Sequence, residues 1–256
     1  MDPNLAVYED EQVVSIYQHQ HYLTRGENHI LQSQESVLRN CRLLDIGVGA
    51  GRTTKYLLPL VAEYQGIDYS APMVEACKLQ FAGQAKAIFK HEDARNLLQF
   101  EANYFDVVLF SFNGIDTVDL PGRIAVLNAV RRVLKPGGQL IFSFHNIGYL
   151  NQLYHYQWAK NPFHWYDNLQ RWRLIRKLNG PKEPYQNLDY CFIRDGGEQF
   201  RILICYSRPS WQIKQIETYG YSFLEAIDSQ SGNGIDRIQI DQHQGAWIYL
   251  RCRKEL

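Results

Sequence analysis

Residues 43–52 read LLDIGVGAGR and decide the fold. An apolar run ends in the acid Asp45, a glycine-rich turn follows, and residues 52–58 (RTTKYLL) have the composition of a helix. Glycine lets the backbone turn sharply and lets a ligand approach without meeting a Cβ atom. A helix that begins behind such a turn directs free N–H groups at a polar ligand. The stretch therefore predicts a ligand-binding loop between a strand and a helix.

A second acid, Asp68, ends the next strand-like run at residues 63–67. It lies close to the offset of roughly 20 residues expected for an acid that holds a ribose, so the two features together predict a nucleoside-containing cofactor. A nicotinamide or flavin dinucleotide is disfavoured because Arg52 stands where the third glycine of G-x-G-x-x-G belongs. A nucleoside triphosphate loop is disfavoured too, because no Gly-Lys-Ser/Thr follows.

The glycine turn resembles the first motif of the class I S-adenosylmethionine (SAM)-dependent methyltransferases, small-molecule type. Further motifs of that family follow in the family's order between about residues 41 and 145. They are residues 66–70 (GIDYS) with Met73, residues 91–97 (HEDARNL), residues 105–109 (FDVVL) and residues 131–140 (RRVLKPGGQL).

Strand-like and helix-like segments alternate along the chain, which predicts an α/β fold with a doubly wound, mostly parallel sheet. The resemblance implies the seven-stranded Rossmann-like form of this sheet. We expect strands at 42–46, 64–68, 86–90, 105–110, 139–144, 221–228 and 245–252, and helices at 51–62, 71–81, 121–134 and 209–219.

Residues 1–256 are expected to form one methyltransferase domain with two additions. Residues 1–40 would be an N-terminal helical lid, helical over 10–38 with a break near 24–26. Residues 147–206 would be an insertion that caps the substrate, made of helices and a β-hairpin. The hairpin strands are expected at about 187–194 and 199–206, around the turn Asp195-Gly196-Gly197.

The resemblance implies SAM as the cofactor and S-adenosylhomocysteine as its product. Asp45 would anchor the turn, and Asp68 would accept hydrogen bonds from both ribose hydroxyls. An arginine of the lid, Arg25, would pair with the SAM carboxylate. The full set of implied cofactor residues is Tyr17, Arg25, Asp45, Gly47, Gly49, Gly51, Asp68, Tyr69, Met73, Asp93, Ala94, Arg95, Ser111, Phe112 and Asn113.

Four of these residues have an alternative role that needs no ligand. Asp45 would then only cap the turn, and Asp93 would be a loop acid. Tyr17 would belong to the core, and Arg25 would be a solvated surface base.

The acceptor side of the site carries fewer signals. His145 follows the fifth strand and is the candidate general base, because the pKa range of histidine suits proton transfer; the alternative is a histidine that only hydrogen-bonds a loop. The expected substrate-binding residues are Tyr22, His145, Asn146, Arg208 and Trp211.

Missing motifs narrow the acceptor class. The segment after the fourth strand reads SFNG (residues 111–114) and not the Asn/Asp-Pro-Pro-Tyr of enzymes that methylate exocyclic or amide nitrogens. No cysteine follows a proline as in cytosine C5 enzymes, and no cluster of acids indicates a metal site. The acceptor class that these absences leave is a small molecule methylated on N, O or C. The alignment of acceptor and SAM would supply most of the rate enhancement.

Alternatives for the insertion stay open at this point. Its aromatic residues would suit an apolar or cationic acceptor, or they would form the core of a packed cap. RNA binding would use Arg171, Arg173, Arg176 and Lys177 with the neighbouring Trp residues. A membrane surface with a lipid-like acceptor such as a quinone precursor is another alternative. A SAM-binding protein without catalysis is a further alternative. The 27 basic and 27 acidic residues disfavour a nucleic-acid partner.

The remaining features favour a cytoplasmic monomer or homodimer. The N-terminal residues are polar, with no signal-like apolar core. No apolar run is long enough to span a bilayer, and the five cysteines form no C-x-x-C pair.

Overall fold

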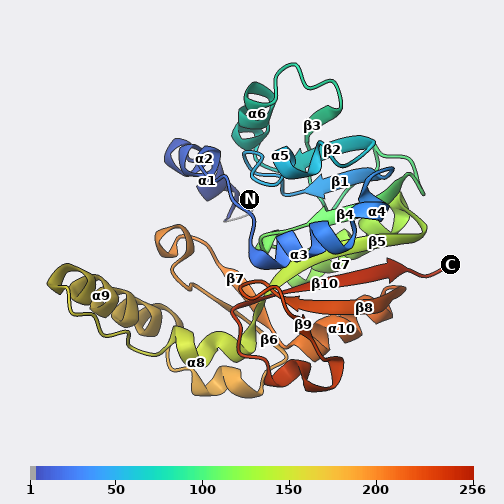
Figure 1. Ribbon diagram of the computed structural model, residues 1–256. Helices are drawn as coiled ribbons and strands as arrows, with labels where there is room; N and C mark the ends of the chain where they lie inside the picture. The colour runs from blue at the N-terminus through green and yellow to red at the C-terminus, as the bar shows by residue number, and fades with distance from the viewer. Residues whose placement is uncertain (1–3) are drawn as a thin grey trace.

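The computed structural model describes residues 4–256, so residues 1–3 of the predicted lid lie outside the described residues. A twisted sheet with helices on both faces forms the centre of the molecule (Figure 1). Five parallel strands run in the order β3-β2-β1-β4-β5, and β10, β8 and β9 continue the sheet in antiparallel pairs. Their bounds are β1 (Arg42–Ile46), β2 (Glu63–Asp68), β3 (Ala87–His91), β4 (Phe105–Phe110), β5 (Leu134–Asn146), β8 (Tyr221–Asp228), β9 (Gly234–Ile235) and β10 (Trp247–Lys254).

Successive side chains of a strand point to opposite faces of the sheet. Because helices cover both faces, the apolar strands are buried on both sides. Leu44 packs with α7 (Leu120–Val133) and α10 (Pro209–Thr218) on one face. Its neighbour Leu43 packs on the other face with α3 (Arg25–Ser33), α4 (Glu35–Leu38) and α6 (Ala71–Gln80). The result is the predicted three-layer α/β architecture.

The predicted α/β class is confirmed, but the sheet has ten strands and not seven. The additional strands are β9 and the hairpin strands β6 (Tyr190–Ile193) and β7 (Ile204–Ser207). Strand β7 pairs in parallel with the end of β5, where His145 lies opposite Tyr206. The insertion is therefore joined to the sheet by backbone hydrogen bonds.

The helix expected at 51–62 is wrong, because only α5 (Thr54–Leu57) forms there. Gly51 has a φ of +93°, which extends the turn, and Pro59 lacks the N–H that would continue the helix. The break expected at 24–26 is also misplaced. It lies between α2 (Glu11–Gln18) and α3, which begins at Arg25 because Thr24 and Glu27 form a capping box.

The hairpin forms, but without the predicted tight turn at residues 195–197. Residues 194–203 join β6 to β7 and include the 3₁₀ segment η4 (Gly197–Phe200). Within it, Glu198, Gln199 and Phe200 have φ between +44° and +65°, a left-handed conformation that costs non-glycine residues about 1–2 kcal/mol each.

The insertion begins directly after β5 and lies at the end of the sheet (Figure 1). Its remaining elements are η2 (Ile147–Tyr149), α8 (Leu150–Leu153), α9 (Pro162–Asn179) and η3 (Glu183–Asn187). Ile175 of α9 is buried, and the helix extends away from the sheet. Apolar residues of α8, β6 and β7 form one cluster with residues of α1 (Leu5–Tyr8), α2 and α6. Within residues 4–256, no helix has both the length and the apolar character needed to cross a bilayer.

Candidate functional site

Three adjoining cavities lie along the ends of the parallel strands. The loops after β1, β2, β3 and β4 form most of the wall of the inner cavity. Its volume is about 790 Å³, part of it open to solvent. Ligand sites commonly measure about 300–1,000 Å³. The middle cavity shares walls with the inner one at Tyr17, Phe112 and Thr117. The outer cavity shares His145 and Trp247 with the middle one.

The glycine turn forms one wall of the inner cavity. Gly47 and Gly49 have φ of +64° and +55°, which non-glycine residues rarely adopt. A Cβ atom on Gly49 would lie 3.3 Å from the ring of Tyr17, and one on Gly47 would lie 3.0 Å from the ring of Phe110. Both positions therefore need glycine to keep the cavity wall in place.

Asp68 lies opposite this turn and lines the inner cavity. One carboxylate oxygen accepts a hydrogen bond from the N–H of Gly49 at 2.9 Å, and the other accepts one from the N–H of Ser70 at 2.9 Å. Each oxygen keeps a lone pair for a further donor. Burial raises the pKa of the Asp68 carboxyl to about 6, against the effect of these N–H groups. The site thus holds a preoriented acceptor for two hydroxyls.

Most of the predicted cofactor residues lie together in this cavity. They are Tyr17, Gly47, Gly49, Asp68, Tyr69, Met73, Asp93, Ala94, Arg95, Ser111 and Phe112. Asp93 is already paired, because Arg95 Nε lies 2.9 and 3.0 Å from its two oxygens. Burial acts to raise the pKa of Asp93, but the hydrogen bonds from Arg95 outweigh it and lower that pKa.

Two predicted cofactor residues support the turn from outside the cavity. Asp45 is buried and accepts hydrogen bonds from the hydroxyls of Thr53 and Tyr64, each at 2.7 Å. Burial raises the pKa of Asp45 to about 6. A Cβ atom on Gly51 would lie 2.5 Å from the ring of Phe81, so this glycine allows the turn to pack against the end of α6.

Arg25 does not reach the inner cavity. It lines the outer one, and the prediction that it pairs with a cofactor carboxylate is therefore not supported. Arg52 lies behind the wall residue Phe112 and forms two hydrogen bonds of 2.6 and 2.8 Å with the Glu27 carboxylate. Its guanidinium also lies over the ring of Phe112, at 4.3 Å from the centroid. This buried pair ties the start of α3 to the glycine turn.

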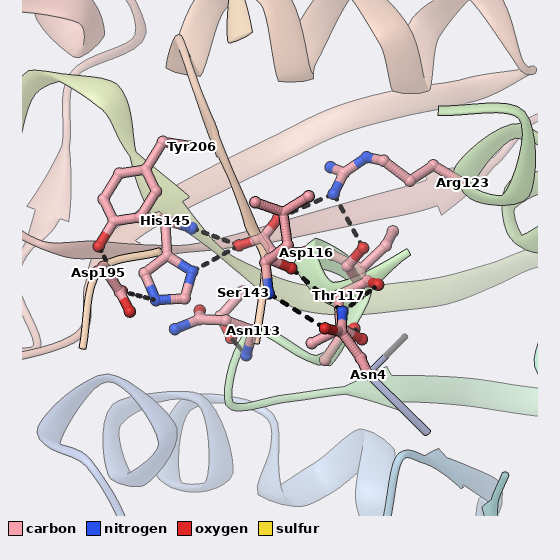
Figure 2. Close-up of polar contacts among 12 residues, drawn as sticks. Asn4, Asn113, Asp116, Thr117, Arg123, Ser143, His145, Asp195 and Tyr206 are labelled. Atoms are coloured by element: carbon pink, nitrogen blue, oxygen red, sulfur yellow. Dashed lines mark hydrogen bonds and ion pairs between the residues drawn. The ribbon is translucent and has the colours of Figure 1, made fainter. Parts of the chain in front are cut away.

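His145 lies at the end of β5 and lines both the middle and the outer cavity. Asp116, in η1 (Gly114–Thr117), is fully buried and its carboxylate lies 2.9 Å from His145 Nδ1 and 2.6 Å from the backbone N of His145. Arg123 donates to the other oxygen of Asp116 at 2.8 Å. Figure 2 shows this chain of polar contacts, which fixes the ring orientation and turns Nε2 away from Asp116.

A second carboxylate lies near the free side of the ring. Asp195 has an oxygen 3.9 Å from His145 Nε2, and the same oxygen accepts the Tyr206 hydroxyl at 2.8 Å (Figure 2). Tyr206 also packs along the imidazole ring at a centroid distance of 4.8 Å, and Trp247 packs on it edge to face at 5.7 Å. The histidine is thus oriented by one acid and faces another across its Nε2 atom.

The other predicted substrate residues lie elsewhere. The Asn146 amide is occupied by backbone groups of Gly148, His243 and Gly245. The Tyr22 ring lies on the surface against Phe112 and Arg52. Arg208 reaches Asp189 and Leu188, and Trp211 stacks on Tyr190. These four substrate predictions are not supported, because none of the four side chains lines one of the three cavities.

Asn113 was predicted as a cofactor residue but lines the middle cavity. The sequence analysis missed several residues of the cavity walls, namely Tyr8, Thr117, Asp195, Tyr206 and Trp247, and named Arg171 only as part of the basic insertion. A signal existed for Asp195, which begins the Asp-Gly-Gly segment next to a predicted strand. None existed for Trp247, which reaches the site by pairing with His145 across two antiparallel strands.

Comparisons with known proteins agree with this geometry. Residues 43–138 match a protein family described as "Methyltransferase domain". A demethylmenaquinone methyltransferase of Clavibacter sepedonicus is 35% identical over 100 residues, 39% of each chain. One of Staphylococcus aureus is 33% identical over 132 residues, 50% of this chain and 51% of that one. The chain thus spans about half the length or less of these curated relatives.

Solved structures extend the likeness to nearly the whole chain. A SAM-dependent methyltransferase of Clostridium acetobutylicum superposes with a TM-score of 0.62 at 16% identity, over 91% of this chain and 92% of that one. The 1,6-didemethyltoxoflavin-N1-methyltransferase of Burkholderia thailandensis, solved with 1,6-didemethyltoxoflavin and S-adenosylhomocysteine, superposes with a TM-score of 0.61 at 13% identity, over 98% and 88%. At these identities the likeness shows the fold. Together with the family match over residues 43–138, it shows that the chain has the Rossmann-like fold of SAM-dependent methyltransferases and a segment similar to their methyltransferase domain.

Proposed function

We propose that the protein transfers the methyl group of SAM to a nitrogen or oxygen atom of a small-molecule acceptor. One observation carries the proposal: the cavity that contains Asp68 adjoins a second cavity in which the buried His145–Asp116 pair presents a free imidazole nitrogen. The first part suits a nucleoside, and the second suits removal of a proton.

The inner cavity fits SAM by the chemistry of its walls. The free lone pairs of Asp68 would accept the two ribose hydroxyls, and Tyr69 and Met73 would flank the adenine. Gly47 and Gly49 would leave room for the methionine part, because neither carries a side chain of its own. SAM, when bound, supplies a methyl group on a positively charged sulfur.

His145 would remove the proton of the acceptor. The acceptor's oxygen or nitrogen would attack the methyl carbon and form the O–CH₃ or N–CH₃ bond. The electron pair of the broken S–CH₃ bond would stay on sulfur, and the acceptor's proton would pass to His145 Nε2. Asp116 accepts from Nδ1–H and holds this tautomer, and the nearby Asp195 stabilises the positive charge that the ring gains. The products are the methylated acceptor and S-adenosylhomocysteine.

A small molecule suits the site better than a nucleic acid because the reacting nitrogen lies inside the molecule. The His145 side chain is only 9% exposed and lies between η1, β7 and β10. A cytoplasmic location and a monomeric or homodimeric state stay predictions.

The test is a calorimetric titration with S-adenosylhomocysteine, followed by radiolabelled methyl transfer from SAM to a panel of metabolites. We expect S-adenosylhomocysteine to bind and a small acceptor to become labelled. No binding would overturn the cofactor assignment. Binding without labelling of any metabolite, but with labelling of tRNA, would overturn the small-molecule assignment.

A further inference from the structure

The Asn113 amide is a buried polar group in the wall of the middle cavity. The residue is 3% exposed, yet neither its Oδ1 nor its Nδ2 has a hydrogen-bond partner within residues 4–256. Leaving a buried amide unsatisfied costs about 1–3 kcal/mol. Native proteins contain few such groups, and an unpaired one that lines a cavity needs an explanation, such as a ligand or an ordered water that binds there.

The backbone that presents this amide is strained and firmly held. Phe112 and Asn113 are consecutive residues with φ of +55° and +61°. The N–H of Asn113 donates to the hydroxyl of Ser143 at 2.7 Å, which fixes the turn onto β5 (Figure 2). Strain of this kind is stored where function needs it. The turn places Asn113 in the wall of the middle cavity together with His145.

The outer cavity carries an excess of positive charge. Arg25, at the start of α3, and Arg171, on α9, both line it. Within the described part of the chain, neither forms an ion pair with a carboxylate; Arg171 donates to the backbone oxygen of Asp195. The carboxylate of Asp195 is the acid in this wall, and it is held by Tyr206 and by the N–H of Gly197. Arginine binds carboxylate and phosphate groups with two parallel hydrogen bonds.

Aromatic side chains line the outer cavity together with these arginines. They are Tyr149, Tyr206 and Trp247, beside His145, and flat apolar walls with few polar groups are typical of small-molecule sites. A flat molecule that spans the middle and outer cavities would meet Asn113 in the first, Arg25 in the second, and His145 and Arg171 in both.

We propose that the acceptor is a flat, anionic small molecule whose reacting hydroxyl or amine binds the Asn113 amide beside His145, and whose anionic group faces Arg25 and Arg171. This inference rests on the proposed function and names its substrate class. It also moves Asn113 from the cofactor to the acceptor.

Two probes that differ in charge test the class. 4-Hydroxybenzoate carries a hydroxyl and an anionic group at opposite ends, and 4-hydroxybenzamide replaces the anion with a neutral amide. In the presence of saturating S-adenosylhomocysteine, we expect calorimetry to show the acid binding at least about tenfold more tightly than the amide. The double variant Arg25→Gln/Arg171→Gln should abolish this preference. Equal affinities, no binding of either probe, or an unchanged preference in the double variant would overturn the proposal.

A glycine variant tests Asn113 without adding backbone strain, because glycine accepts the left-handed conformation. Asn113→Gly should weaken 4-hydroxybenzoate binding by about tenfold and leave S-adenosylhomocysteine affinity unchanged. The matched control is Asn103→Gly, since Asn103 is also left-handed, with φ of +57°, but bonds Lys254 outside the cavities; it should change neither affinity.

The outcomes separate this inference from the proposed function. If Asn113→Gly weakens S-adenosylhomocysteine and not the acid, Asn113 belongs to the cofactor and the inference fails while the function stands. If wild-type protein does not bind S-adenosylhomocysteine, the proposed function fails, and the titrations of both probes without it still decide the charge preference.

Discussion

The inner cavity and the two cavities beyond it differ in how the chain builds them. The inner cavity takes most of its walls from loops that follow β1, β2, β3 and β4 in order. The middle and outer cavities combine α3, η1, α9, the β6–β7 connection and β10 around His145. The first is made by a repeated local rule of parallel sheets, and the second by tertiary packing alone. The inner cavity is therefore determined by the fold itself, and the middle and outer cavities are determined by the segments added to that fold.

The largest effect is expected at the acceptor end. His145→Asn keeps a donor for Asp116 but removes Nε2, so methyl transfer to the acceptor found in the panel should fall by roughly 10²- to 10⁴-fold. The affinity for S-adenosylhomocysteine should not change, because His145 does not line the inner cavity. Single-turnover transfer and calorimetry measure the two quantities.

His243→Asn is the matched control, since His243 also lies 2.8 Å from an acid, Asp228, but away from the cavities. An undiminished transfer rate in His145→Asn would show that alignment alone supplies catalysis. That result would remove the proposed base.

The buried ion pair between Arg52 and Glu27, which ties α3 to the glycine turn, should matter mainly for the stability of the protein. Arg52→Met leaves the Glu27 carboxylate buried without its partner, which should lower the free energy of unfolding by about 3–5 kcal/mol. Urea unfolding measures this change. Arg39→Met breaks a pair with Glu35 whose side chains are 67% and 47% exposed, and should cost only about 0–1 kcal/mol. Equal losses in both variants would mean that the buried pair does not hold the turn.

A smaller effect is expected at the cofactor end. Asp68→Ala removes an acceptor for two hydroxyls, so S-adenosylhomocysteine should bind more weakly by about 1–3 kcal/mol. Calorimetry measures the loss. Asp236→Ala, which removes only the cap of the 3₁₀ segment η5 (Arg237–Gln242), serves as the control and should bind normally.

The pH dependence of S-adenosylhomocysteine binding tests the role of Asp68 further. Burial raises the pKa of Asp68 to about 6, so the free protein holds a protonated carboxyl below that pH. Donors on the ribose favour the ionised form, so affinity should be full above pH 6 and fall as the pH drops, by at most about tenfold per pH unit. Titrations between pH 5 and 8 measure this, and Asp68→Asn should remove the dependence. A flat profile in wild-type protein would contradict the ribose role.

Much of the fold could be predicted from sequence because its signals are local. β1 begins and ends as expected, since Leu43 and Leu44 are followed by an acid and a glycine turn. The α6 helix begins at Ala71 as predicted, where the hydroxyl of Ser70 caps it by accepting from Met73 N. The failed helix at 51–62 shows the limit, because the turn around Gly51 is set by packing against Phe81.

The site residues show the same difference between local signals and long-range contacts. Asp68, Tyr69 and Met73 follow from one strand end and one helix start, so a motif in a single segment is enough to place them. Arg25 and Asn113 were predicted on the cofactor side and lie on the other. The sequence around these two residues carries no signal that α9 and β10 lie beside them, because those contacts join residues far apart in the chain.

The most direct test of the separation is one set of S-adenosylhomocysteine titrations on wild-type protein, Asp68→Ala and His145→Asn at pH 7.5. The account predicts that wild-type protein and His145→Asn bind with equal affinity, and that Asp68→Ala binds more weakly. Binding that is lost in His145→Asn and kept in Asp68→Ala would contradict it, because the cofactor would then lie beyond the inner cavity.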